Sequence, residues 1–125
     1  MHTTSPTVLL IEDSINMGMV LCELLGEYGF QAKRLNCVEE FYSHMYQLSP
    51  DLVVMDMLLY GLDACSVAHC YKQKEDFKHV PLIMMSAHPE GRKRCLLAGA
   101  DDYIPKPFSI EDLIPILHRH LHTIP

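Results

Sequence analysis

Short apolar runs alternate with helix-like segments along this chain, and this alternation constrains its fold more than any other feature. The strand-like segments occupy residues 8–11, 31–35, 52–55, 82–85 and 102–104. Segments of helical spacing separate them; the first has apolar residues three and four apart from Met17 to Tyr28 and stops at Gly29. Parallel strands need crossover connections, so five strands alternating with five helices predict an α/β fold. We expect a doubly wound, five-stranded parallel sheet with helices on both faces.

The polarity of each strand predicts its place in the sheet. Continuous apolar runs suit central strands that are covered on both faces, whereas residues 31–35 (QAKRL) are polar enough for an edge strand. Two helix starts carry a capping box, in which a side-chain oxygen satisfies an unpaired backbone N–H: Asn36 with Glu39, and Ser109 with Asp112. Pro115 lies inside the last helical segment and is expected to kink it.

Length and composition exclude several classes of protein. The chain has 125 residues, of which 49% are hydrophobic, and no repeat or linker interrupts it, so we expect one domain over residues 1–125. Its apolar runs fall far short of the roughly 18 residues that a membrane span needs. The first residues do not resemble a secretory signal, so a cytoplasmic location is expected. A net charge of −6 argues against a general nucleic-acid-binding surface.

Cysteine and histidine usage adds no separate site. The five cysteines are scattered without a C-x-x-C pair, which favours a reduced, structural role. His118, His120 and His122 lie near the end of the chain, and only the first and third share a helical face. Two histidines without a carboxylate or cysteine make a poor metal site, so we expect them to be structural or solvated.

Polar residues follow the strands at the edge where ligands bind in open parallel sheets. They are Glu12, Asp13, Asp56, Ser86 and Lys106. Three carboxylates held close together repel one another and retain a proton or bind a cation, and their hard oxygens suit Mg²⁺. With Mg²⁺ on one side and the Lys106 ammonium on the other, the charge of a phosphoryl group on Asp56 would be neutralised. The sequence therefore predicts that the Asp56 carboxylate is a nucleophile for phosphoryl transfer.

The sequence resembles the receiver domains of two-component response regulators. Four segments carry the resemblance: residues 9–14 (LLIEDS), 51–57 (DLVVMDM), 84–87 (MMSA) and 99–108 (GADDYIPKPF). The resemblance extends from residue 7 to about residue 121. It implies a flavodoxin-like sheet of strand order 2-1-3-4-5 with five helices. It also implies a regulatory phosphoacceptor domain rather than an enzyme.

The resemblance implies a metal site around the acceptor. Asp56 would accept a phosphoryl group from a partner, either a sensor histidine kinase or a phosphotransfer protein. Asp13, Asp56 and the backbone carbonyl of Leu58 would bind Mg²⁺, and Glu12 would act through a bound water. Leu58 and His88 occupy positions that tune hydrolysis of the aspartyl phosphate in this family.

The resemblance also implies a switch. Ser86 and Lys106 would each contact a phosphoryl oxygen, and the Lys106–Pro107 peptide bond is expected to be cis. Tyr103 would turn inward when Ser86 moves toward the phosphoryl group. This movement would couple the site to a surface made by the fourth helix (about 89–98), the fifth strand and the fifth helix (about 110–121). The charged residues expected there suit a homodimer or another protein partner, and are Arg92, Lys93, Arg94, Glu111, Asp112 and Arg119.

Two loop positions depart from the family pattern. The proline that usually follows the acceptor is replaced by Tyr60, and the glycine that usually follows Asp63 is replaced by Ala64. These departures affect the shape of the loop more than its capacity for phosphorylation.

Other functions are less compatible with the motifs. A phosphohydrolase of the haloacid dehalogenase type needs a second aspartate two residues after the first, where this chain has Leu58. A nucleotide- or flavin-binding module needs a glycine-rich first loop, whereas residues 12–16 (EDSIN) are acidic and lack glycine. The sequence is also compatible with an interaction module that works without phosphorylation. It does not decide between a regulator acting alone and the amino-terminal part of a longer protein.

Overall fold

A five-stranded parallel sheet forms the centre of the computed structural model, which describes residues 5–35 and 38–121. Its strands are β1 (Thr7–Ile11), β2 (Gln31–Leu35), β3 (Leu52–Asp56), β6 (Leu82–Ser86) and β7 (Asp102–Pro105). They lie in the order β2-β1-β3-β6-β7, which is the predicted order 2-1-3-4-5 when the strands of this sheet are counted alone. The predicted fold class is confirmed, and the polar strand β2 lies at an edge as expected.

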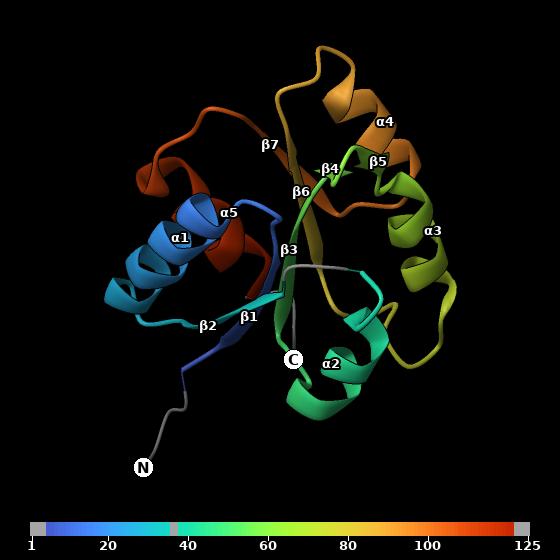
Figure 1. Cartoon of the computed structure of the whole chain (residues 1–125). Helices are drawn as coiled ribbons and strands as arrows, with labels where there is room; N and C mark the ends of the chain where they lie inside the picture. The colour runs from blue at the N-terminus through green and yellow to red at the C-terminus, as the bar shows by residue number, and fades with distance from the viewer. Residues whose placement is uncertain (1–4, 36–37, 122–125) are drawn as a thin grey trace.

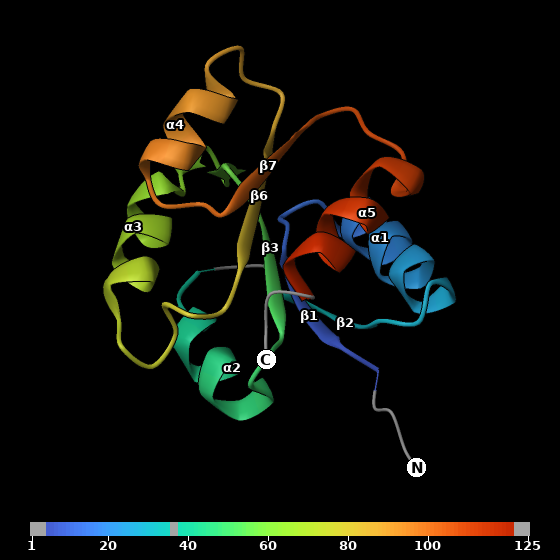
Figure 2. The same ribbon diagram turned by 180° about the vertical axis from the view of Figure 1, so that it is seen from behind.

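Helices cover both faces of the sheet. They are α1 (Ile15–Glu27), α2 (Phe41–Leu48), α3 (Cys65–Gln73), α4 (Gly91–Leu97) and α5 (Ile110–Leu121). Figures 1 and 2 show α1 and α5 together on one face, with α2, α3 and α4 on the other. None of the helices described has the length and apolar content that would let it cross a membrane.

Successive side chains of the central strands enter two separate cores. In β1, Val8 and Leu10 belong to the core beneath α1 and α5, whereas Leu9 and Ile11 belong to the core on the opposite face. All four are fully buried. Side chains alternate across a strand and both faces of this sheet are covered, so every residue from Val8 to Ile11 is apolar.

Helix boundaries follow local capping chemistry at the expected positions Gly29 and Ser109, and at Ser14, which was not predicted. Helix α1 starts after Ser14, whose hydroxyl accepts a hydrogen bond from the Met17 N–H at 3.3 Å, and the chain leaves the helix at Gly29 with φ of 90°. Before α5, the Ser109 N–H donates to the Asp112 carboxylate at 3.1 Å, which is one half of a capping box.

Other helix boundaries differ from the sequence predictions. The capping box predicted at Asn36 lies outside the described residues, and α2 begins only at Phe41. Helix α4 is shorter than the predicted range 89–98. Helix α5 continues through Pro115 to Leu121, and the kink expected there stays a prediction.

A small hairpin after β3 was not predicted. It consists of β4 (Leu58–Leu59) and β5 (Leu62–Asp63), which pair antiparallel. Tyr60 and Gly61 form its turn with φ of 51° and 76°, and a two-residue turn with both φ values positive matches the twist of a hairpin. Strands of two residues are too short for a periodic pattern. Figure 1 shows the hairpin at the carboxyl end of β3, near α4.

Candidate functional site

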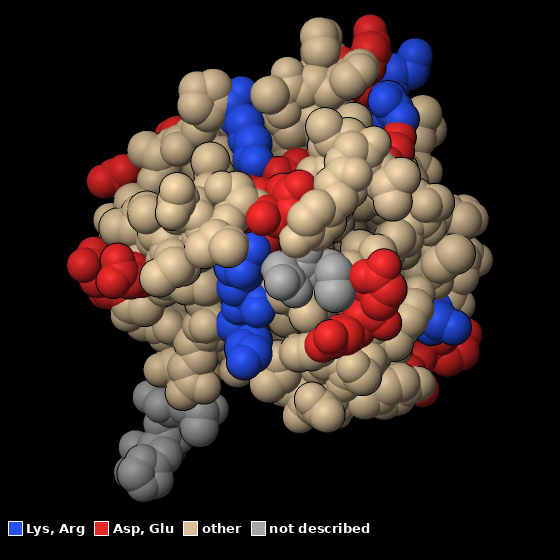
Figure 3. All heavy atoms as spheres, in the orientation of Figure 1, with Lys and Arg blue, Asp and Glu red and all other residues tan. Residues whose placement is uncertain are grey.

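A cleft of about 620 Å³ lies at the carboxyl ends of the central strands and brings together the residues predicted from the sequence. Its lining includes Glu12, Asp13, Asp56, Leu58, Ser86, His88 and Lys106. Asp63 of the hairpin and Arg94 of α4 also line it. Figure 3 shows acidic atoms in the middle of this side of the molecule, with basic atoms above and below them.

Three carboxylates form the centre of the cleft. Glu12, Asp13 and Asp56 each offer an oxygen atom, and these oxygens all lie within 4.8 Å of one another. Within residues 5–35 and 38–121 they are the one such group able to hold a metal ion. Glu12 and Asp56 are buried, whereas Asp13 is half-buried. Oxygen donors from two or three carboxylates fit the preference of Mg²⁺ for hard ligands.

The ammonium of Lys106 balances part of this negative charge. Its Nζ atom donates hydrogen bonds to Asp56 at 2.5 Å and to Glu12 at 3.0 Å. Burial lowers the pKa of Lys106, but these hydrogen bonds and the negative charges of Asp56 and Glu12 together outweigh burial and leave the pKa above its usual value. Burial raises the pKa of Glu12, and the bonds to Lys106 and to the Ser14 N–H oppose that rise. The lysine thus compensates the negative charge of the carboxylates only in part.

Arg34 supports the chain segment that carries the first two carboxylates. Its Nε donates to the carbonyl of Glu12 at 3.0 Å, and its guanidinium donates to the carbonyl of Asp13 at 3.3 Å. The aliphatic stem of Arg34 passes against Gly18 of α1, where a Cβ atom would overlap it. Sequence analysis assigned Arg34 only to an edge strand. The structure places it opposite Leu10, near the carboxyl end of β1, and no sequence signal indicated this contact.

The hairpin turn contacts Asp13 directly. The Tyr60 N–H donates to Asp13 Oδ2 at 2.8 Å, and this hydrogen bond is the main reason that the pKa of Asp13 lies below its usual value. The N–H of Leu58 donates to Asp56 Oδ1 at 3.1 Å. Sequence analysis placed Tyr60 in a loop without a role.

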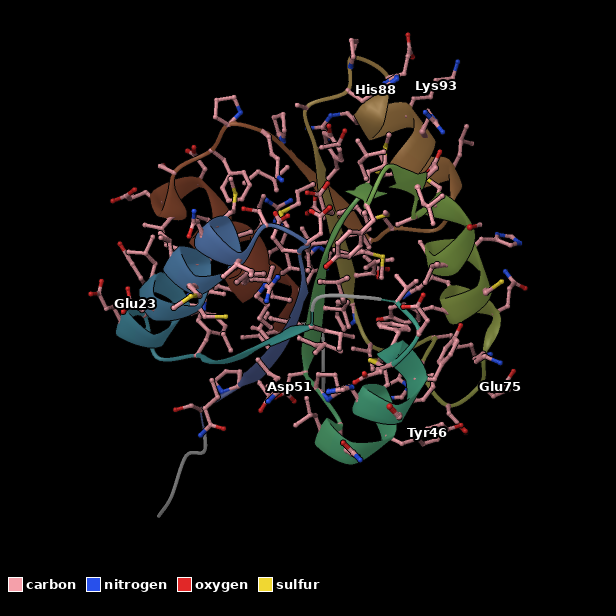
Figure 4. The ribbon with its side chains drawn as sticks, in the orientation of Figure 1. Glu23, Tyr46, Asp51, Glu75, His88 and Lys93 are labelled. Atoms are coloured by element: carbon pink, nitrogen blue, oxygen red, sulfur yellow. The ribbon has the colours of Figure 1, made fainter. Side chains whose placement is uncertain are left out.

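The hydroxyl and aromatic residues of the predicted switch lie beside the carboxylates. Ser86 is buried at the end of β6, and its hydroxyl accepts from the His88 N–H at 2.8 Å. Tyr103 is also buried, and its hydroxyl donates to the Ser86 carbonyl at 2.9 Å, so its ring already lies inward here and the inward turn on phosphorylation stays a prediction. His88, labelled in Figure 4, is exposed, and its ring Nδ1 accepts a hydrogen bond from the Glu90 N–H at 2.9 Å. The Lys106–Pro107 peptide bond is cis.

Several charges on the expected partner surface are engaged within the chain. Asp102 of β7 contacts Arg119 at 3.1 Å and His120 at 3.0 Å, both on α5. The guanidinium of Arg92 lies 5.2 Å from the centre of the Tyr103 ring. Arg94 forms an ion pair with Asp63 of the hairpin. Part of the charge on this surface is therefore engaged in ion pairs within the chain.

None of the remaining candidates that the structure describes lines the cleft. Cys22, Cys65, Cys70 and Cys95 are free cysteines, and Cys37 lies outside the described residues. His118 packs against the ring of Phe30 with centroids 5.6 Å apart, and His120 contacts Asp102. His122 lies outside the described residues.

Comparison with known proteins identifies relatives along most of the chain. The family model of the response regulator receiver domain matches residues 8–118. The phosphate regulon transcriptional regulatory protein PhoB of Rhizobium meliloti is 30% identical over 111 residues, which cover 87% of this chain and 49% of that protein. The chain thus spans about half the length of the curated relatives that it matches.

Solved structures share the fold. The signal receiver domain of a signal transduction histidine kinase from Syntrophus aciditrophicus is 27% identical with a TM-score of 0.86, covering 96% of this chain and 92% of that one. The receiver domain of a sensor histidine kinase from Pseudomonas aeruginosa PAO1 is 28% identical with a TM-score of 0.85, covering 94% and 98%. That structure has a magnesium ion coordinated in its active-site cleft.

Proposed function

The chain belongs to the response regulator receiver domain family, and we propose that residues 1–125 act as one phosphorylation-dependent signalling switch with Asp56 as the phosphoacceptor. One observation carries the proposal. Asp56 ends a central strand in a cleft where two further carboxylates, a lysine and a serine converge. Receiver domains are regulatory, and the chemistry proposed here is limited to accepting and losing a phosphoryl group.

Mg²⁺ is the proposed cofactor of this reaction. The carboxylates of Asp13 and Asp56 and the backbone carbonyl of Leu58 would hold it, with Glu12 acting through a water molecule. The donor oxygens of this cluster fit Mg²⁺, and the Pseudomonas receiver domain binds magnesium in its own cleft. When bound, Mg²⁺ neutralises negative charge on the phosphoryl oxygens.

The protein's own side chains account for the rest of the transfer. A carboxylate oxygen of Asp56 attacks phosphorus, the new O–P bond forms, and the P–N bond to the histidine of the kinase or phosphotransfer partner breaks. Lys106, already 2.5 Å from Asp56, stays close enough to pair with a phosphoryl oxygen. Ser86 donates its hydroxyl hydrogen to another oxygen. Leu58, an apolar residue, offers no side-chain group to orient a hydrolytic water, whereas His88 does.

The signal is proposed to leave the site through Ser86 and Tyr103. Their hydrogen bond connects β6 to β7, so a shift of Ser86 toward the phosphoryl group alters the packing of Tyr103 beneath α4. The surface formed by α4, β7 and α5 is then the proposed contact for a second copy or another protein. We propose no direct contact of this domain with nucleic acid or membrane, and a cytoplasmic location, where its cysteines stay reduced.

The decisive experiment is the intact mass of the protein after incubation with acetyl phosphate, with and without Mg²⁺. We expect a Mg²⁺-dependent gain of about 80 Da, the mass of a phosphoryl group, that is lost in Asp56→Asn. Asp51→Asn is the matched control, because Asp51 lies at the opposite end of the same strand (Figure 4). No gain with acetyl phosphate or with a phosphorylated histidine kinase would favour an interaction module that works without phosphorylation.

A further inference from the structure

The turn of the β4–β5 hairpin contacts the acidic site through its backbone. The Tyr60 N–H donates to Asp13 Oδ2 at 2.8 Å across 47 positions of sequence. Tyr60 is 59% exposed as a residue, so burial of its ring is not what holds it against the site. Hydrogen bonds from a backbone N–H to an ionised carboxylate are stronger than those between neutral groups. The proposed chemistry does not use this contact.

The hairpin is held at its base as well as at its turn. The Ala64 N–H donates to the Met57 carbonyl at 2.7 Å and closes the loop. Asp63 accepts from the Cys65 N–H at 2.9 Å and also forms the ion pair with Arg94 of α4. These contacts fix the direction in which the turn presents its N–H. A rigid donor orients its acceptor more effectively than a mobile one, because less conformational entropy is lost.

We propose that Tyr60 is a positioning residue for the acidic site, acting through its N–H on the Asp13 carboxylate. The bond restrains Oδ2 of Asp13 and so fixes the orientation of a carboxylate that belongs to the candidate metal site. A proline at this position would lack the N–H, and its φ near −65° would not fit the observed 51°. The inference rests on the proposed function only in treating Asp13 as a Mg²⁺ ligand.

The consequence is a measurable change in metal affinity. Groups that orient the ligands of a metal typically change its affinity 10- to 100-fold when they are removed. This contact is a single hydrogen bond at the edge of the cleft, so the lower end of that range applies. We expect Mg²⁺ to bind about tenfold more weakly when the Tyr60 N–H is absent.

The contact itself is tested first, without metal, by hydrogen exchange and ¹⁵N NMR of the Tyr60 amide. We expect a protected amide despite the exposed side chain, loss of that protection in Asp13→Ala, and partial retention in Asp13→Asn, which keeps an acceptor oxygen. Rapid exchange in the wild-type protein, or protection that persists in Asp13→Ala, would overturn the proposal. This arm needs no phosphorylation, so it can fail or succeed independently of the proposed function.

The effect on the metal is tested by titrating Mg²⁺ and following amide chemical shifts, since the chain has no tryptophan to report binding by fluorescence. Tyr60→Pro removes the N–H, whereas Tyr60→Gly keeps it and tolerates a positive φ. We expect Mg²⁺ to bind about tenfold more weakly to Tyr60→Pro than to the wild-type protein. We expect Tyr60→Gly, which keeps the N–H, to bind Mg²⁺ as the wild-type protein does. Equal or tighter binding in Tyr60→Pro would contradict the proposal, as would equal weakening in both variants. Thermal unfolding of each variant shows whether the fold is intact.

Discussion

The ammonium of Lys106 lies 2.5 Å from a carboxylate oxygen of Asp56 and 3.0 Å from one of Glu12. Both carboxylates are buried, and Lys106 joins them from the loop after β7. The same carboxylates belong to the proposed metal site. Lys106 therefore stabilises the negative charge of Glu12 and Asp56, and it also opposes the binding of a second cation beside them.

This double role predicts opposite effects of Lys106→Met on metal binding and on phosphorylation. Removal of the ammonium should tighten Mg²⁺ binding about tenfold, because a competing positive charge is lost. Phosphorylation by acetyl phosphate should slow at least 100-fold, because one compensating charge is missing in the transition state. The two carboxylates left without a cation should lower the free energy of unfolding by about 3 kcal/mol.

Lys106→Arg is the matched control for this variant, since it keeps the positive charge. Mg²⁺ titrations, initial rates of mass gain and urea unfolding measure the three effects. If Mg²⁺ bound Lys106→Met no more tightly than the wild-type protein, the view of Lys106 as a competing cation would be wrong.

The contact between Arg34 and Gly18 predicts that Gly18→Ala changes the free energy of unfolding in opposite directions with and without Arg34. Alanine normally stabilises a helix relative to glycine by about 1 kcal/mol. In the wild-type protein, however, Gly18→Ala should be destabilising, because the new Cβ displaces the Arg34 stem and its bonds to the Glu12 and Asp13 carbonyls. In an Arg34→Ala background the same change should stabilise the protein. Urea unfolding of the four proteins measures the coupling. Equal effects of Gly18→Ala in both backgrounds would contradict the predicted contact.

The sheet and its helices could be predicted because each central strand has a sequence signal of its own. Residues 8–11, 52–55 and 82–85 are apolar on both faces, and turn residues and helical segments separate them. Once the strands are parallel, their carboxyl ends meet at one edge, so the convergence of Asp56, Ser86 and Lys106 follows from the order of the segments.

The supporting contacts could not be predicted in the same way. Arg34 acts through its side chain on backbone carbonyls, and Tyr60 acts through a backbone N–H that every residue except proline has. No residue type marks such contacts in a sequence. The hairpin that places Tyr60 is made of two-residue strands, which show no periodicity. Helix α2 started later than predicted because capping boxes indicate possible helix starts without fixing where the helix packs.

The buried position of Tyr103 depends on the absence of a side chain at Gly91. A Cβ atom at residue 91 would overlap the Tyr103 hydroxyl and come close to the Ser86 hydroxyl. Gly91→Ala should therefore push the Tyr103 ring toward solvent and cost about 1–2 kcal/mol of stability. Tyr103→Phe in the same background should recover part of that loss, since it removes the overlapping atom. NMR signals of the Tyr103 ring and urea unfolding are the measurements. No recovery in the double variant would show that the overlap lies elsewhere.

Asp102 predicts a pH dependence of stability that is separate from the proposed site. Burial raises the pKa of this carboxyl, but hydrogen bonds with His120 and the Tyr103 N–H, together with the charges of Arg119 and His120, outweigh burial and leave the pKa below its usual value. A pKa lowered by folding contributes stability that is present above the unfolded value of about 3.9 and is lost as the pH falls through the folded value. The wild-type protein should therefore lose more stability than Asp102→Asn when the pH falls from 5 to 3.

Urea unfolding at several pH values measures this difference, with Glu23→Gln on the exposed side of α1 as control. Parallel losses in the wild-type protein and Asp102→Asn would mean that Asp102 does not hold α5 to β7 through its charge.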